Sequence, residues 1–115
     1  MRQVTIELSA LEVRGARAAV LEALTDQVFD AEPDLLAQSE YLLAELSTGG
    51  TPAEGAARPS RTVQIDSVGL EVVDRSFAHA AASIEGWELS IRIGLTVDQL
   101  HELRSRISAL RRGTL

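Results

Sequence analysis

The chain has 115 residues, enough for one domain, with a formal net charge of −6 and a sequence pI of about 4.8. This acidity argues against general binding to nucleic acids or anionic membranes, which requires an excess of Lys and Arg. The absence of cysteine excludes disulfide bonds and thiolate-based zinc sites, and aromatic residues at 3% leave the core to Leu, Val, Ile and Ala.

The composition also gives expectations about origin and location. Every cationic side chain is arginine, and together with the richness in alanine this indicates the GC-rich codon usage of a bacterial-like genome. The sequence shows neither a secretory signal nor an apolar stretch near the ~20 residues that span a bilayer. We therefore expect a cytoplasmic protein with no membrane partner and a single domain over residues 1–115.

The first element is a strand that leads directly into a helix. In Met1–Leu8, apolar and polar residues alternate, which is typical of a half-buried strand. Ser9 and Glu12 have the spacing of a capping box, in which each side chain bonds the other residue's backbone N–H. Leu8 and Val13 flank this box as a hydrophobic staple. The pattern predicts a helix that starts at Ala10.

Two helices are expected before the middle of the chain. The first runs over residues 10–30, with one apolar face made of Val13, Ala16, Val20, Leu24 and Val28. Gly15 inside it indicates either a close approach of another backbone or a tolerated surface glycine. Pro33 suits a first helical turn, so a second helix is predicted from Pro33 to Leu46. Residues 47–61 are rich in Gly and Pro and predict a flexible loop, functional or disordered, with disorder favoured.

The second half of the chain has the pattern of a β-rich segment. Short alternating runs predict strands at Val63–Ile65 and Leu70–Val73, with Gly69 as a turn or bulge between them. Glu85 and Gly86 fit the two-residue turn of a hairpin that leads into a strand over Trp87–Leu95. Residues 76–84 fit either a strand or a short helix. In the last strand, Trp87, Leu89, Ile91 and Ile93 are expected to share one face.

The junction between strand and helix is then repeated near the end of the chain. Thr96 and Gln99 form a second capping box, and Leu95 and Leu100 form its staple. A final helix is predicted over residues 97–112. The two junctions indicate either an old duplication or convergence on the same capping solution, and convergence is the simpler interpretation.

These elements predict an α+β fold, in the order β-α-α-loop-β-β-(β)-β-α. The fold is an antiparallel sheet of four to five strands with about three helices on one face. An open sheet with few aromatic residues leaves an edge or a face uncovered, and a homodimer would cover it.

No motif in the sequence indicates an enzyme class, a cofactor or a family. Phosphate-binding glycine loops and nucleophile elbows are absent. His79 and His101 are the only histidines, and neither has metal-ligand spacing to a second His. We predict no catalytic residue, no metal and no cofactor, so an enzyme is not favoured. His79 is simplest to interpret as a half-buried structural residue.

The remaining features favour a non-catalytic, self-associating binding or adaptor protein that acts through a protein partner. The expected interaction surface combines an acidic helix turn with C-terminal arginines: Asp26, Asp30, Glu32, Asp34, Arg104 and Arg111. The alternative is a small-molecule-binding protein or minor enzyme with a pocket between sheet and helices. Its candidate polar groups are His79, Asp74, Trp87 and Tyr41. Nucleic-acid contact through the C-terminal arginines is a third and weaker hypothesis.

Overall fold

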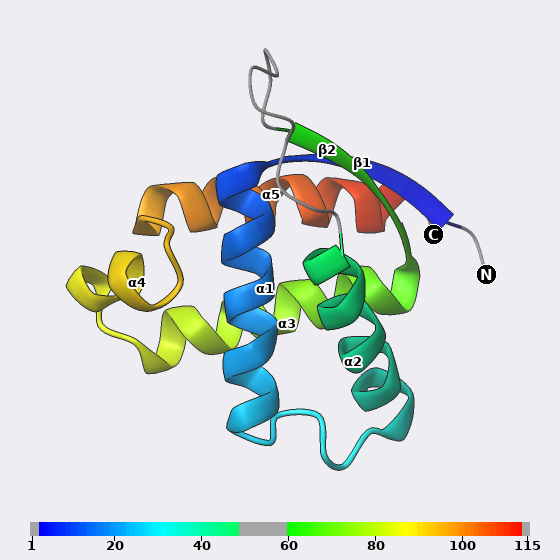
Figure 1. The fold of residues 1–115 in the computed structure, drawn as a ribbon, viewed down its shortest axis with the longest axis horizontal. Coiled ribbons are helices and arrows are strands. Elements are labelled where there is room, and N and C mark those ends of the chain that lie inside the picture. Colours follow the sequence, from blue (N-terminus) through cyan, green and yellow to red (C-terminus); the bar gives the residue numbers. More distant parts are fainter. Residues whose placement is uncertain (1–2, 49–59, 114–115) are drawn as a thin grey trace.

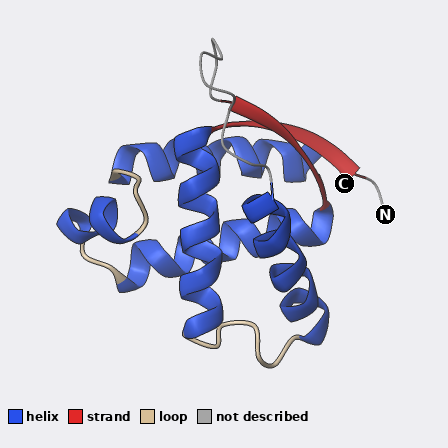
Figure 2. Ribbon diagram, in the orientation of Figure 1, coloured by secondary structure: helices blue, strands red, loops and turns tan. Residues whose placement is uncertain are grey.

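A computed structural model describes residues 3–48 and 60–113, which form seven elements. Their order is β1 (Gln3–Ser9), α1 (Ala10–Thr25), α2 (Pro33–Thr48), β2 (Ser60–Asp66), α3 (Ser67–Ser83), α4 (Gly86–Arg92) and α5 (Val97–Gly113). Helices therefore dominate the described part of the chain, and the two strands form one antiparallel sheet (Figure 2).

The helices are stacked in two layers beneath the sheet. Figure 1 shows α1 and α2 in front of α3 and α5, with the β1–β2 ribbon at the upper right and α4 at the far left. Helix α1 packs on both α2 and α3, and α3 packs on α5, so α3 is central. The core is aliphatic apart from Phe29 and Phe77, which are both fully buried. This agrees with the scarcity of aromatic residues in the sequence.

The sheet has one apolar and one polar face. Its register pairs Gln3 with Asp66 at one end and Ser9 with Ser60 at the other. The side chains buried against the helices are Ile6, Leu8, Val63 and Ile65. The exposed side chains on the other face are Thr5, Glu7, Thr62 and Gln64. Because side chains alternate along a strand, this is the period-two pattern predicted for the first strand.

The predicted sheet of four to five strands is wrong, although the chain does combine helices with an antiparallel sheet. The segments Leu70–Val73 and 76–83 belong to one long helix, α3, and Ile84 is its C-cap. Asp66 caps its start, since its Oδ1 accepts a hydrogen bond from Gly69 N at 2.8 Å. The buried residues Leu70, Val73, Phe77 and Ala80 then follow at three- and four-residue spacing.

The predicted hairpin and its strand over Trp87–Leu95 are wrong as well. Residues 86–92 form α4, for which Glu85 is the N-cap. Leu89 and Ile93 are each 2% exposed, whereas Trp87 is 70% and Ile91 74% exposed. The four apolar residues that were expected on one strand face therefore form two i,i+4 pairs on opposite sides of the helix. Leu89 and Ile93 face the core, and Trp87 and Ile91 face outward.

Helix α1 ends five residues before its predicted end. Gln27 has a φ of 61°, and the N–H of Val28 bonds the Ala23 carbonyl at 3.0 Å. The N–H of Gln27 bonds the Leu24 carbonyl at 3.1 Å, which completes a Schellman motif. Glycine is the usual residue at this position of the motif. Because the sequence has glutamine there, it does not indicate where α1 ends.

Both predicted capping boxes are confirmed. Ser9 N donates to Glu12 Oε1 at 2.9 Å, and Glu12 N donates to Ser9 Oγ at 3.1 Å. In the second box, Thr96 N donates to Gln99 Oε1 at 2.9 Å and Gln99 N to Thr96 Oγ1 at 3.2 Å. Helix α2 begins at Pro33 as predicted. The predicted loop at 47–61 lies largely outside the described residues; its ends belong to α2 and β2.

Candidate functional site

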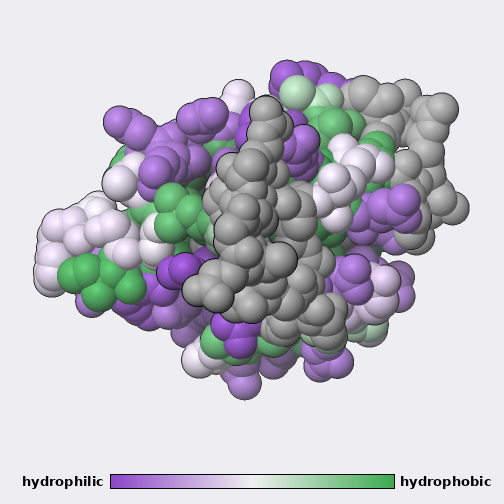
Figure 3. Space-filling model, turned by 45° about the horizontal axis from the view of Figure 1, so that its top comes forward, coloured by the Kyte–Doolittle hydropathy of each residue, from purple (hydrophilic) through white to green (hydrophobic). Residues whose placement is uncertain are grey.

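Among the described residues, the two large apolar side chains with the highest exposed fractions lie on α4. Trp87 and Ile91 lie one turn apart on its outer side, and Val97, in the first turn of α5, is 40% exposed. A Cβ built on Gly86 would lie 3.5 Å from Val97 Cγ2, so Val97 adjoins the start of α4. Figure 3 shows hydrophobic atoms at this left-hand end of the molecule. We call Trp87, Ile91, Val97 and the neighbouring acidic residues Glu85, Glu88 and Asp98 the α4 surface.

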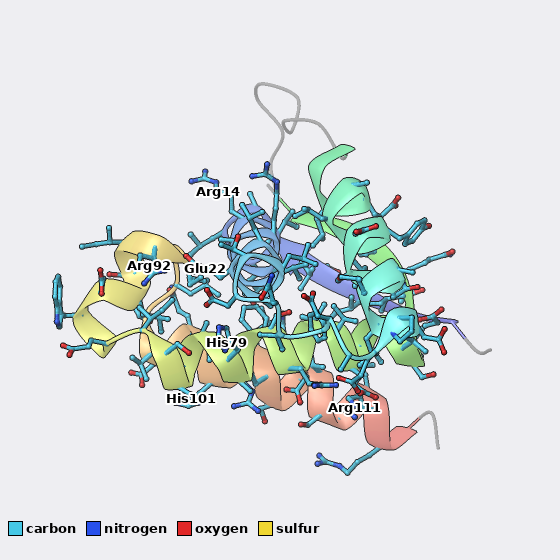
Figure 4. All side chains as sticks on the ribbon, turned by 90° about the horizontal axis from the view of Figure 1, so that it is seen from below. Arg14, Glu22, His79, Arg92, His101 and Arg111 are labelled. Atoms are coloured by element: carbon cyan, nitrogen blue, oxygen red, sulfur yellow. The ribbon has the colours of Figure 1, made fainter. Side chains whose placement is uncertain are left out.

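The inner side of α4 and two polar contacts fix the position of this surface. Leu89 and Ile93 bury their side chains in the core. Arg92 Nη2 donates to both carboxylate oxygens of Glu22 on α1 at 2.8 Å, and Figure 4 shows these two residues side by side. The Trp87 indole Nε1 donates to Glu85 Oε2 at 2.9 Å. This bond orients the exposed indole toward Glu85.

The electrostatics around α4 are acidic. The hydrogen bond from Arg92 to Glu22 raises the pKa of the guanidinium above its ordinary value, and the nearby charges of Glu88 and Asp26 act in the same direction. Arg92 thus remains charged and faces three carboxylates. One arginine does not balance three acidic groups, so this end of the molecule keeps an excess of negative charge.

His79, a predicted pocket residue, lies on α3, where it contacts Asp26 of the predicted interaction surface and Ser83 of its own helix. Its Nε2 is 2.7 Å from Asp26 Oδ2, and its Nδ1 is 3.3 Å from Ser83 Oγ. A serine, a histidine and an aspartate in a row have the composition of a hydrolase triad. Ser83 and Asp26 are exposed, however, and these three residues line neither of the two hollows described below. The arrangement joins the end of α1 to α3.

The acidic helix turn is attached to α3 as well. Arg75 Nη1 lies 2.7 Å from Glu32 Oε2, and its guanidinium carbon lies 5.4 Å from the centre of the buried Phe29 ring. Asp30 and Asp34 are exposed. Two of the four predicted acidic residues, Asp26 and Glu32, therefore make contacts that hold the turn against the fold.

The C-terminal arginines lie elsewhere and share one carboxylate. Arg104 Nε and Arg111 Nη1 each lie 3.1 Å from an oxygen of Asp74, which is 15% exposed. Figure 4 shows Arg111 near the C-terminal end of α5, away from α4. The predicted interaction residues are therefore separated: the acidic turn packs on α3, and the arginines pack over α3 from α5.

The predicted pocket residues do not converge. Asp74 contacts the two arginines, Trp87 is on α4, and Tyr41 is 59% exposed on α2. Between sheet and helices lies a cavity of ≈ 20 Å³ with an entirely apolar lining that includes Ile6, Val63 and Leu103. That volume is near the minimum for one water molecule, and an apolar cavity of this kind stays dry.

A second hollow, of ≈ 160 Å³, lies between the starts of α1 and α5. Its lining comes from both capping boxes and their neighbours: Ser9, Leu11, Glu12, Leu95, Gln99 and Glu102. Glu12 also bonds Arg106 of α5 at 2.9 Å. Ser9 and Glu12 bond each other within the first capping box, and Gln99 bonds Thr96 within the second, so these polar groups already have partners.

Sequence reasoning missed most of the α4 surface. Trp87 was expected in a pocket, while Ile91, Arg92 and Glu22 were not singled out. The available signal was the i,i+4 spacing of Trp87 and Ile91, which is compatible with a helix and which the strand interpretation concealed.

Metal-binding clusters and membrane-spanning helices are both absent from the described residues. Residues 3–48 and 60–113 contain no group of three or more His, Asp or Glu side chains arranged to hold a metal ion. Nor does any helix of this part of the chain have the length and apolarity to cross a membrane. Comparisons with protein families, with curated proteins and with solved structures find no match to this chain.

Proposed function

We propose that the protein is a non-catalytic binding or adaptor domain that works in the cytoplasm and binds a protein partner through the α4 surface. The observation that carries the proposal is the pair Trp87 and Ile91, which are 70% and 74% exposed on a helix whose other side is buried. A helix that is apolar on both sides is normally covered on both. Tryptophan is also among the residues that contribute most to binding at protein interfaces.

The rigidity of the surface supports the same proposal. The indole of Trp87 is bonded to Glu85, and α4 is bonded to α1 through Arg92 and Glu22. Binding by a surface that is already ordered loses little conformational entropy, so more of the contact energy contributes to affinity. The small dry cavity under the sheet offers no comparable support for a ligand-binding function.

Self-association is a separate part of the proposal. Among the described residues, the exposed outer face of the two-stranded sheet is a place where a second copy could pack. The molecular mass in sedimentation equilibrium tests this part, and a monomer at micromolar concentration would remove it.

A selection experiment tests the binding function. Random peptides displayed on phage are selected against the wild-type protein and then offered to a Trp87→Ser/Ile91→Ser double variant. We expect the selected peptides to lose binding to the double variant, because it lacks both apolar anchors. Circular dichroism checks that the variant is folded, which we expect because both side chains are mostly exposed.

Tyr41→Ser is the matched control, since it removes another exposed ring on a different helix. Peptides that bind all three proteins equally well would show that the α4 surface is not the binding face.

A further inference from the structure

The apolar part of the α4 surface is surrounded by carboxylates. Glu85 and Glu88 belong to the start of α4, and Asp98 follows Val97 in α5. Glu85 and Asp98 are exposed, and Glu88 is half-buried. Each apolar side chain of the surface thus has an acidic residue beside it in the sequence or within one turn.

The single arginine of α4 does not offset this charge. Arg92 bonds both oxygens of Glu22 and lies near Glu88 and Asp26 as well. A partner that approaches the surface therefore meets an apolar ridge within a negative field. Acidic side chains on the partner would be repelled, and basic ones would be attracted.

The geometry of the ridge also restricts the partner. Trp87 and Ile91 stand at i and i+4 on one side of a helix, so they form a ridge along its axis. Ridges of this spacing pack between the side chains of another helix. A second copy of this chain would bring a second set of the same carboxylates to the interface, and this doubling of negative charge opposes self-pairing here.

We propose that the partner of the α4 surface is a basic amphipathic helix of another protein. Its apolar stripe packs along Trp87 and Ile91, and its Arg or Lys side chains face Glu85, Glu88 and Asp98. This inference rests on the proposed binding function and adds the chemical class of the partner.

The chain supplies its own reporter for a test, because Trp87 is its only tryptophan. Three synthetic amphipathic helices are titrated into the protein, each with leucine on one face and without aromatic residues. The opposite face carries arginine in the first peptide, glutamine in the second and glutamate in the third. We expect a blue shift of the Trp87 emission with the arginine peptide at much lower concentration than with the glutamine peptide, and none with the glutamate peptide.

Charge variants test the acidic residues directly. Glu85→Gln/Glu88→Gln/Asp98→Asn keeps the shape of the surface and removes three charges. We expect it to bind the arginine peptide roughly tenfold or more weakly at low salt, and to lose most of the salt dependence seen with the wild type. Anisotropy of a labelled peptide gives the affinities. The control is Glu40→Gln/Glu45→Gln, which removes two negative charges from α2, a helix that does not contribute to the α4 surface. We expect it to change the affinity little.

The outcomes separate this inference from the proposed function. Equal binding of the arginine and glutamine peptides, unaffected by the charge variant, would overturn the basic partner and leave the binding function in place. No emission shift with any peptide would overturn the inference. In that case the phage selection tests the binding function independently. A concentration-dependent shift of the protein alone would assign the surface to a second copy. A shift with phosphatidylcholine vesicles would assign it to lipid.

Discussion

Gly15 shows how α1 packs against the residue that precedes the second capping box. A Cβ built on Gly15 would lie 2.5 Å from Leu95 Cδ1 and 2.6 Å from Leu95 Cγ. Leu95 is 1% exposed, and both its Cγ and its Cδ1 would have to shift to admit a methyl group at position 15. The close approach expected at this glycine therefore exists, but the neighbour is the buried side chain of the second hydrophobic staple rather than another backbone.

Gly15→Ala should lower stability although alanine favours helices. The better helix propensity is worth up to about 1 kcal/mol, whereas overpacking a buried site costs about 1–3 kcal/mol. We therefore expect a net loss of about 1 kcal/mol in urea unfolding. Leu95→Ala alone should cost about 2–5 kcal/mol.

The double variant supplies the control for this prediction. Removing the Leu95 side chain makes room for the new methyl group, so adding Gly15→Ala to Leu95→Ala should not destabilise further. Additive losses in the double variant would show that Leu95 is not the neighbour that requires glycine at position 15.

At the scale of the element, α1 ends at a residue whose type does not indicate a helix end. Gln27 takes the left-handed conformation of a Schellman motif with a φ of 61°. Residues other than glycine pay roughly 1–2 kcal/mol for this conformation. Gln27→Gly should therefore raise the free energy of unfolding, by about 0.5–1 kcal/mol after the added flexibility of the unfolded chain is included. Urea denaturation measures the gain.

Gln27→Ala is the matched control, because alanine has the same steric restriction as glutamine at positive φ. We expect it to be no more stable than the wild type. If the alanine variant proved as stable as the glycine variant, backbone conformation would not be what limits this position.

The elements divide into those with local signals and those without. The first strand, both capping boxes and the starts of α1, α2 and α5 followed from short sequence patterns that the structure contains. Helix α3 did not, because its cap, Asp66, directly follows the predicted strand Val63–Ile65, and Leu70–Val73 is compatible with both periods. The α4 surface was not predicted either, because the spacing of Trp87 and Ile91 also fits a strand, and both residues were assigned to one strand face.

At the scale of the whole molecule, each half of the chain needs the other. Strand β1 pairs with β2, and α1 packs on α3, so residues before and after 49–59 share one core. Fragments of ~55 residues bury too small a fraction of their surface to fold securely alone. We expect fragments 1–53 and 54–115 to be unfolded separately and to recover helical circular dichroism when mixed.

The two faces of β2 provide matched controls for this complementation. Ile65→Asp places a charge on the buried face of the sheet and should abolish recovery, whereas Gln64→Asp on the exposed face should not. A fragment that unfolds cooperatively on its own would contradict the shared core.

The two-sided build of α4 has a consequence for how this stretch of sequence tolerates change. Leu89 and Ile93 are constrained by packing in the core, whereas Trp87 and Ile91 are exposed and, under the proposed function, are constrained by the partner. The two constraints alternate every second residue along α4 and its C-cap, Ile93. Under the proposed function, we expect the outer pair to change with the partner while the inner pair stays fixed.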